Sequence, residues 1–334
     1  MDNTETAIRY PLLRIDLQKL KTNLETLSAL VKGAGCSLMV VTKSFCADKR
    51  IVEMLAASPL VDYLADARIQ NIKTYAGRGK PTVLLRLPQA CEIRDVVSFA
   101  DISLNSDPDT LGLLGREAER QNKRHKIILM IDLGDLREGI YFENGEKILK
   151  TAEAVLSMPG LELYGIGTNL TCYGAVIPKK DNLSVLVSWA ERIYEHCGVK
   201  PAVVSGGNSS SLYLIEKGEL PGGTNNLRLG ESFVLGRETA WGTRIKNTFH
   251  DAIILETQII ETQVKPSMPS GESGFDAFGK KPVFEDRGMM KRGICAAGKQ
   301  DIDPSGIIPL DPGIEILGAS SDHLIVNMNA SEHG

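Results

Sequence analysis

The 334-residue sequence lacks the features of membrane, secreted and nucleic-acid-binding proteins. No apolar run approaches the roughly 18 residues that a membrane-spanning helix needs. The N-terminal stretch MDNTETAIRYPLL has no basic segment followed by an apolar core, so we expect no signal peptide. With 38 basic and 42 acidic residues the net charge is −4, which gives neither a basic stripe for nucleic acid nor a polybasic membrane patch.

Cysteine and histidine are sparse, and neither is arranged in a metal-binding motif. The six cysteines include no CxxC pair, which favours reduced thiols in a cytoplasmic protein over a disulfide framework or a zinc site. The five histidines show no metal-ligand spacing either, so we expect no bound metal.

Short apolar runs recur along the first 230 residues, and a helix-like stretch follows each of them. Several runs are β-branched without polar alternation, which is typical of parallel strands covered on both faces. Eight strand–helix units predict an α/β protein with a (β/α)8 TIM-type barrel. An open doubly wound sheet is the alternative, but no GxGxxG motif follows the first run. The expected strands are 37–43, 61–66, 82–88, 101–106, 126–134, 163–170, 202–207 and 226–230.

The pattern changes after about residue 240. The stretch DAIILETQIIETQVKP alternates like half-exposed strands, and Pro and Gly then separate short apolar runs. We therefore predict two domains: a barrel over residues 1–240 and a smaller, mostly antiparallel β domain over 241–334.

The first expected strand ends in SLMVVTKSFC, where Lys43 closes an apolar run. A lysine there is either a solvated surface charge or a reactive amine at the barrel mouth, where the carboxyl ends of the strands carry the chemistry. Other strand ends favour the second interpretation, because Arg137, Asn169 and Arg228 follow or end later strands. The turn SGGNSS adds glycines that permit close backbone approach, together with the donors of Asn208 and Ser209, as a phosphate site requires. A lysine, a phosphate-binding turn and buried arginines in one mouth are the outline of a pyridoxal 5'-phosphate site.

Three stretches carry a resemblance to a known family: GIGTNLTCYGAVIP, SGGNSSSL and KPVFEDRGMMKRGICAAGKQD. With them the chain resembles the alanine racemase family of barrel enzymes that use pyridoxal phosphate, and within it the ornithine racemase branch. The resemblance spans nearly the whole length. It implies an amino-acid racemase, an isomerase, that acts on a small amino-acid substrate as a homodimer.

The resemblance also implies the roles of the cofactor site. Lys43 would hold the cofactor as a Schiff base and serve as one of two bases. Asn208 and Ser209, with the amides of Gly230 and Glu231, would hold the phosphate.

Three further residues would surround the cofactor ring. Asn169 falls where alanine racemases place a histidine, Arg137 matches the arginine near the phenolic oxygen, and Arg228 matches the one facing the pyridine nitrogen. A guanidinium at 228 leaves that nitrogen unprotonated, which suits racemisation better than decarboxylation. The alternative is a structural arginine in a salt bridge.

Racemisation by two bases needs a second group on the opposite face of the Cα carbon. The family's tyrosine is missing from SGESGFDAFGKKP, so we favour Asp276, with Cys295 and Tyr173 as alternatives. Met130 stands where many alanine racemases have a modified lysine that braces the arginine, and Ala47 where they have a phosphate-binding tyrosine.

The stretch GASSDHLIV matches the loop beside the substrate carboxylate and implicates Ser321 and Asp322. The sequence then stops at NMNASEHG, short of the last strands expected for the family, which questions the activity of this form. Small side chains at the mouth favour ornithine or another basic amino acid as substrate. The alternatives are alanine racemase proper, a non-catalytic homeostasis protein that binds pyridoxal phosphate, and a decarboxylase of the same fold.

Overall fold

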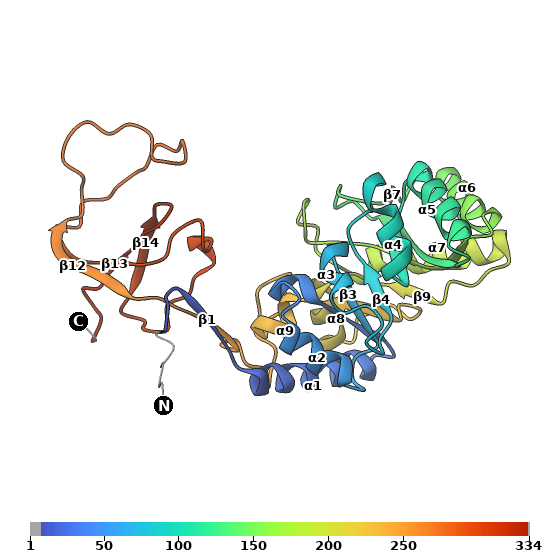
Figure 1. The fold of residues 1–334 in the computed structure, drawn as a ribbon, viewed down its shortest axis with the longest axis horizontal. Helices are drawn as coiled ribbons and strands as arrows, with labels where there is room; N and C mark the ends of the chain where they lie inside the picture. Colours follow the sequence, from blue (N-terminus) through green and yellow to red (C-terminus); the bar gives the residue numbers. More distant parts are fainter. Residues whose placement is uncertain (1–7, 333–334) are drawn as a thin grey trace, which may run out of the picture. The chain divides into compact units, whose positions relative to one another are not determined.

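The computed structural model describes residues 8–332 and divides them into two compact units. The barrel unit comprises residues 16–252, and the second unit combines residues 8–15 with 253–332 (Figure 1). Strand β1 (Leu12–Ile15) pairs with β11 (Ile253–Glu256), so the chain enters the second unit at both of its ends. The expected domain limits differ, since they place residues 12–15 with the barrel and the boundary after 240. Residues 1–7 and 333–334 of those expected domains lie outside the described residues.

Eight parallel strands close into a barrel in the order β2-β3-β4-β5-β6-β8-β9-β10, and β10 pairs with β2 to complete the ring. All eight strands expected from the sequence are present, mostly shorter than predicted. The short strand β7 (Ile140–Tyr141) pairs only with β6 and was not predicted. The strands of the ring are β2 (Ser37–Val41), β3 (Tyr63–Asp66), β4 (Thr82–Leu84), β5 (Ile102–Asn105), β6 (His125–Asp132), β8 (Leu161–Gly167), β9 (Val203–Ser205) and β10 (Asn226–Leu229).

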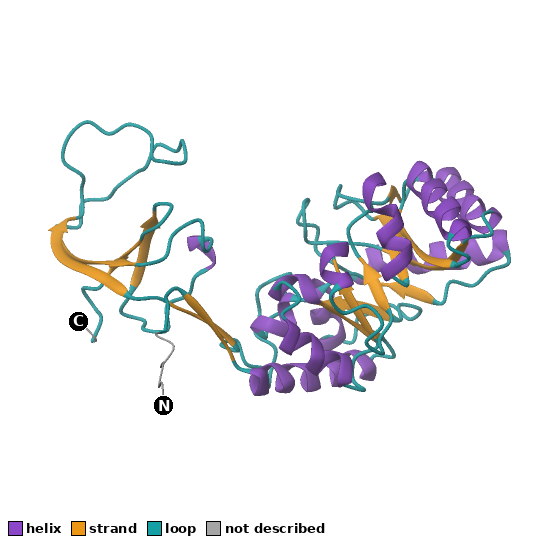
Figure 2. Cartoon of the chain, in the orientation of Figure 1, coloured by secondary structure: helices purple, strands orange, loops and turns teal. Residues whose placement is uncertain are grey.

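Helices surround the strands of the barrel unit (Figure 2). The first begins at Leu17, because the side chain of Asp16 accepts hydrogen bonds from the amides of Gln18 and Lys19. Among residues 8–332 no helix combines the length and apolar character that crossing a membrane requires. The helices are α1 (Leu17–Gly33), α2 (Lys49–Ala57), α3 (Ile69–Lys73), α4 (Ile93–Phe99), α5 (Pro108–Arg120), α6 (Gly145–Ser157), α7 (Lys180–Cys197), α8 (Leu212–Glu216) and α9 (Glu231–Leu235), with 3-10 turns η1 (Thr42–Phe45), η2 (Ala90–Glu92), η3 (Ser209–Ser211) and η4 (Pro304–Gly306).

Apolar side chains from the strands pack together into a buried core of the barrel unit. The cluster includes Met39, Ala65, Leu104, Ile128 and Met130, all of them fully buried. An interior filled in this way is a packed core and not a pore. Polar chemistry is therefore left to the ends of the strands.

The second unit is built from antiparallel strands, as the sequence predicts. Its four-stranded sheet has the order β12-β13-β15-β14, and a small apolar cluster around Cys295 and Val326 packs against it. The loop over residues 267–288 joins β12 to β13 and contains no helix or strand (Figure 1). The strands are β12 (Ile259–Pro266), β13 (Met289–Cys295), β14 (Glu315–Ala319) and β15 (Leu324–Asn327).

Candidate active site at the mouth of the barrel

A cavity of about 580 Å³ lies at the carboxyl ends of the barrel strands. Its walls come from the segments that end or follow β2, β3, β4, β6, β8, β9 and β10, and its volume is typical of a site for a small ligand. Every cofactor residue expected from the sequence lines it. The lining side chains and backbone belong to Val41, Lys43, Ala67, Leu85, Arg86, Leu87, Arg137, Glu138, Asn169, Thr171, Cys172, Asn208, Ser209, Arg228, Gly230, Glu231 and Thr239.

Lys43 lies in the turn η1 immediately after β2. The strand ends at Val41, two residues earlier than predicted, because the turn begins at Thr42, whose buried hydroxyl donates to the carbonyl of Ala65 at 3.2 Å. The buried threonine anchors the turn, whereas the side chain of Lys43 is exposed at the cavity. Within the described part of the chain, the ammonium group has no hydrogen-bond or ion-pair partner. Lys43 is therefore available to a ligand.

Arg228, on β10, is only 2% exposed. Its Nη2 donates to the carbonyl of Thr168 at 2.6 Å and to Oδ1 of Asn169, and its Nη1 donates to the hydroxyl of Ser205. No carboxylate of residues 8–332 forms an ion pair with it, so the structural salt bridge considered above is absent. Burial lowers the pKa of Arg228 to about 10, Glu138 opposes this change and Arg137 adds to it. The guanidinium therefore remains charged at neutral pH although neutral acceptors hold it.

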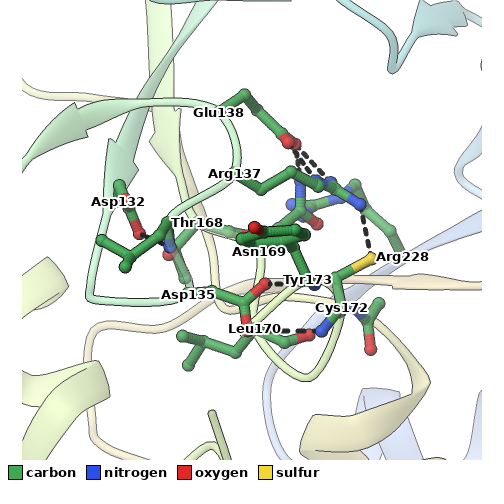
Figure 3. Close-up of polar contacts among 12 residues, drawn as sticks. Asp132, Asp135, Arg137, Glu138, Thr168, Asn169, Leu170, Cys172, Tyr173 and Arg228 are labelled. Atoms are coloured by element: carbon green, nitrogen blue, oxygen red, sulfur yellow. Dashed lines mark hydrogen bonds and ion pairs between the residues drawn. The ribbon is translucent and has the colours of Figure 1, made fainter. Parts of the chain in front are cut away.

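Arg137 and Glu138 follow β6 and form a forked pair. Both oxygens of Glu138 accept from the guanidinium of Arg137, and one also accepts from the amide nitrogen of Asn169 (Figure 3). The Nη1 of Arg137 donates to the sulfur of Cys172. Burial raises the pKa of Glu138. Arg137, Asn169 and the charge of Arg228 together lower it by more than burial raises it, so the net pKa is below its usual value. Glu138 was not predicted; its position directly after Arg137 in DLGDLREGI was the available signal.

Asp135 connects the loops after β6 and β8. It is fully buried, and its carboxylate accepts from the amides of Cys172 and Tyr173 at 3.3 and 2.9 Å (Figure 3). It also accepts from the amide of Val176 at 3.1 Å. This side chain holds the loop that brings Cys172 to the cavity, and it too was missed from the sequence. A buried aspartate that caps the backbone of a distant loop has no local sequence signature.

The turn after β9 forms another wall. Gly207 has φ +105°, a conformation that favours glycine. Asn208 accepts from the amide of Ser210 at 2.9 Å and donates to the carbonyl of Leu170 at 3.0 Å. The hydroxyl of Ser209 accepts from the amide of Ser232 at 3.2 Å, which ties this turn to the first residues of α9. Gly230 and Glu231 are thereby held beside Asn208 and Ser209 along the cavity.

Asp276, Ser321 and Asp322 lie in the second unit, and the cavity is lined by the barrel unit alone. Asp276 is exposed in the loop between β12 and β13, where backbone amides of Lys280 and Phe278 lower its pKa. Ser321 donates to Asp322 at 2.6 Å in the exposed turn between β14 and β15. Their roles stay predictions.

The alternatives to Asp276 differ in accessibility. Cys295 is buried in the core of the second unit, and burial raises the pKa of its thiol, which makes it a poor group for exchanging protons at neutral pH. Tyr173 is 76% exposed on the loop after β8. In residues 8–332 no three His, Cys, Asp or Glu side chains gather as a metal site would require, and His333 lies outside them.

The fold and the cavity define a class of barrel enzyme in which a lysine and a buried arginine share one mouth of an eight-stranded ring, beside an antiparallel unit; the second expected buried arginine, Arg137, is exposed at the cavity. The chain belongs to the alanine racemase family, since the family model described as "Alanine racemase, N-terminal domain" matches residues 15–237, more than half of its length.

Two curated relatives match almost the whole chain. An ornithine racemase of Acetoanaerobium sticklandii is 51% identical over 322 residues, which cover 96% of this chain and 90% of the relative. A lysine racemase of Thermotoga maritima is 39% identical over 321 residues, which cover 96% of this chain and 89% of the relative. The family expected from the sequence motifs is confirmed.

Solved structures share the fold at low sequence identity. An alanine racemase of Clostridium difficile 630 has a TM-score of 0.67 at 18% identity, with 97% of this chain and 84% of that chain covered. A D-threonine aldolase from Filomicrobium marinum has a TM-score of 0.70 at 15% identity, with 96% and 82% covered. These matches confirm the barrel followed by a β domain.

Proposed function

We propose that the protein is a pyridoxal 5'-phosphate-dependent racemase that interconverts L- and D-ornithine. The enzyme class expected from the sequence, an amino-acid racemase, is confirmed by both curated relatives. The assignment of ornithine as the substrate rests on the 51% identity to an ornithine racemase over 96% of the chain. The second relative acts on lysine by its name, so both are racemases of basic amino acids.

The cavity fits the cofactor by its chemistry. Four basic side chains line it against two carboxylates, and Arg86 is paired with Glu92 outside the lining at 2.7 Å. Arg137 is likewise paired with Glu138, so Lys43 and Arg228 are the lining cations without a carboxylate partner among the described residues, and they remain for an anionic ligand that carries an aldehyde. When bound, pyridoxal phosphate supplies a carbonyl that condenses with amines and a ring that withdraws electrons from the Cα carbon of the amino acid.

Each group of lining residues has a proposed task. Lys43 would hold the cofactor covalently. Asn208 and Ser209 would hold its phosphate together with the amides of Gly230 and Glu231.

The remaining polar residues would face the ring. Arg137, Asn169 and Arg228 offer hydrogen-bond donors. Because residue 228 is an arginine, this position has no carboxylate that could share a proton with a ring nitrogen. This favours racemisation over a decarboxylase of the same fold.

The proton work needs one group on each face of the Cα carbon. Lys43, once released from the cofactor, would exchange the proton on one face. We propose Asp276 of the partner subunit for the other face, with Ser321 of the partner subunit and Asp322 of the partner subunit near the substrate carboxylate.

A homodimer is therefore part of the proposal, and exposed apolar side chains support it. Phe275 and Val283 in the loop of the second unit are 79% and 95% exposed, and Leu136 and Trp241 of the barrel unit are 64% and 65% exposed. Surfaces of this kind are commonly covered by a partner. A lid of protein over the mouth would also exclude water that protonates a carbanion indiscriminately.

We also propose a cytoplasmic location. All six cysteines are free thiols, and proteins of oxidising compartments usually pair theirs.

Capture of the cofactor tests the site. Protein mixed with pyridoxal phosphate should turn yellow, and borohydride reduction should fix the cofactor to the peptide that contains Lys43, as mass spectrometry would detect. Lys43→Ala should lose both signals, whereas Lys49→Ala, an exposed lysine on α2, should keep them. Wild-type protein that stays colourless would overturn the proposal.

Chiral chromatography after incubation with L-ornithine, L-lysine or L-alanine tests the reaction. We expect D-ornithine to form fastest, without release of carbon dioxide. Faster turnover of alanine would indicate alanine racemase proper, carbon dioxide a decarboxylase, and unchanged amino acids with bound cofactor a non-catalytic homeostasis protein.

A further inference from the structure

Glu138 is the most heavily engaged acidic side chain of the cavity. Its side chain is only 14% exposed, against 36% for its partner Arg137. One carboxylate oxygen accepts from Nε of Arg137, and the other accepts from Nη2 of Arg137 and from the amide nitrogen of Asn169. A carboxylate suits this place because it offers only acceptors to three donors.

The second lining carboxylate, Glu231, is different. Its side chain is 42% exposed and pairs with Arg237, which does not line the cavity. Glu138 is therefore the acid that organises groups of the cavity itself.

The contacts of Glu138 continue to the most buried cation of the mouth. Asn169 donates to Glu138 through its nitrogen and accepts from Arg228 through its oxygen, so its amide orientation is fixed from both sides (Figure 3). The cluster thus runs from Arg137 through Glu138 and Asn169 to Arg228. Two guanidinium groups near one another repel, and a carboxylate between them offsets that repulsion.

We propose that Glu138 is a positioning residue: its carboxylate holds the guanidinium of Arg137 and the amide of Asn169 in the orientation in which both line the cavity. The inference rests on the proposed function, in which this cavity holds pyridoxal phosphate and the amino acid. It does not require Glu138 to touch either of them.

Glutamine at this position tests the role sharply. Glu138→Gln keeps the size of the side chain but replaces one acceptor by an NH2 group that would face the donors of Arg137 or Asn169. We expect Glu138→Gln to weaken pyridoxal phosphate binding by about tenfold or more, measured by equilibrium dialysis, and to shift the visible absorbance of the loaded protein. Glu138→Asp keeps the charge with a shorter reach and should recover part of the affinity.

A double-mutant cycle separates positioning from a general structural role. The part of the Glu138 effect that passes through Arg137 should vanish once Arg137 is replaced, so the double variant Arg137→Gln/Glu138→Gln should bind the cofactor more tightly than the product of the two single losses predicts. Glu143→Gln, an equal charge change at an exposed residue outside the lining, is the matched control and should behave as wild type.

Three outcomes would overturn the inference: wild-type cofactor affinity in Glu138→Gln, effects of the two substitutions that multiply in the double variant, or a loss explained by a lower melting temperature of the cofactor-free protein. Failure of the wild-type protein to bind pyridoxal phosphate would instead overturn the proposed function, so the two failures can be told apart.

Discussion

The barrel unit and the second unit differ in how completely they cover their own apolar residues. All four residues of β5 are buried, whereas all eight residues of β12 are exposed. Parallel strands under helices bury both of their faces, but β12 is an edge strand of a small sheet. The barrel unit therefore completes its own core, whereas the second unit leaves apolar side chains of its edge strand, such as Ile260 and Val264, exposed.

The same contrast holds for polar residues. In the barrel unit Arg228 is buried and bonded to three neighbours, so the site is largely organised before a ligand arrives. In the second unit Asp276 bonds within its own turn, Asp322 accepts from Ser321 and from Gln300, and both aspartates stay exposed. The barrel provides a site, and the second unit provides exposed groups that could complete a site elsewhere.

The largest expected effect comes from Asp276, the exposed member of this contrast. If Asp276 is the second base, Asp276→Asn should lower kcat by roughly 10²–10⁴-fold in at least one direction of ornithine racemisation. The asparagine oxygen can still accept from the amides of Phe278 and Lys280, so the loop should keep its conformation. Backbone hydrogen bonds keep the pKa of Asp276 low in the free chain, and burial against a partner would raise it toward a useful range.

Steady-state kinetics with both enantiomers separates two roles for Asp276. If it pairs with the distal ammonium of ornithine instead, KM should rise and preference should relax toward neutral side chains, with kcat largely kept. Glu285→Gln, in the same exposed loop, is the control. Wild-type kinetics in Asp276→Asn would contradict both roles and direct attention to Tyr173.

A matched pair of leucines measures the contrast in burial. Leu104 on β5 is fully buried and Leu310 of the second unit is 71% exposed. Leu104→Ala should lower the free energy of unfolding by about 2–5 kcal/mol, because it leaves a cavity in the barrel core. Leu310→Ala should change it by less than about 0.5 kcal/mol.

Urea unfolding followed by circular dichroism provides the comparison. Equal losses in the two variants would contradict the contrast between the units. A loss in Leu310→Ala that grows with protein concentration would place this side chain in the interface between subunits.

The barrel was predictable because each of its strands is a short apolar run bounded by polar or turn residues. All eight strands follow from that local pattern. Strand β1 was missed because it has only four residues, none of them buried, and its partner β11 lies more than two hundred residues later. Their positions at strand ends predicted that Lys43, Arg137 and Arg228 share one mouth, and the structure brings them to one cavity.

The supporting residues of the site were not predictable in the same way. Glu138 and Asp135 act through contacts with loops that follow other strands, and no spacing in the sequence indicates which loops meet. The roles proposed for Asp276, Ser321 and Asp322 need a second copy of the chain, and no pattern within one sequence indicates how two copies meet.

The smallest expected effect concerns a histidine inside the barrel unit. His125, at the start of β6, is 3% exposed, and its Nε2 lies 2.7 Å from the hydroxyl of Ser103. Burial lowers its pKa from 6.5 to about 4, while Asp101 raises it and Lys123 lowers it. Between those values the unfolded chain binds a proton that the folded chain does not, so stability should fall as pH drops from about 6.5 toward 4.

A pKa difference of this size corresponds to a contribution on the order of 3 kcal/mol, fully present above the unfolded pKa. His125→Gln can keep a hydrogen bond to Ser103 but cannot titrate, so it should flatten this part of the stability profile. Urea unfolding at a series of pH values from 4 to 7 measures the slope. His196→Gln, at a partly exposed histidine on α7, is the matched control and should keep the wild-type slope. A His125→Gln variant whose stability falls as steeply as that of the wild type would show that the acid sensitivity arises from other groups.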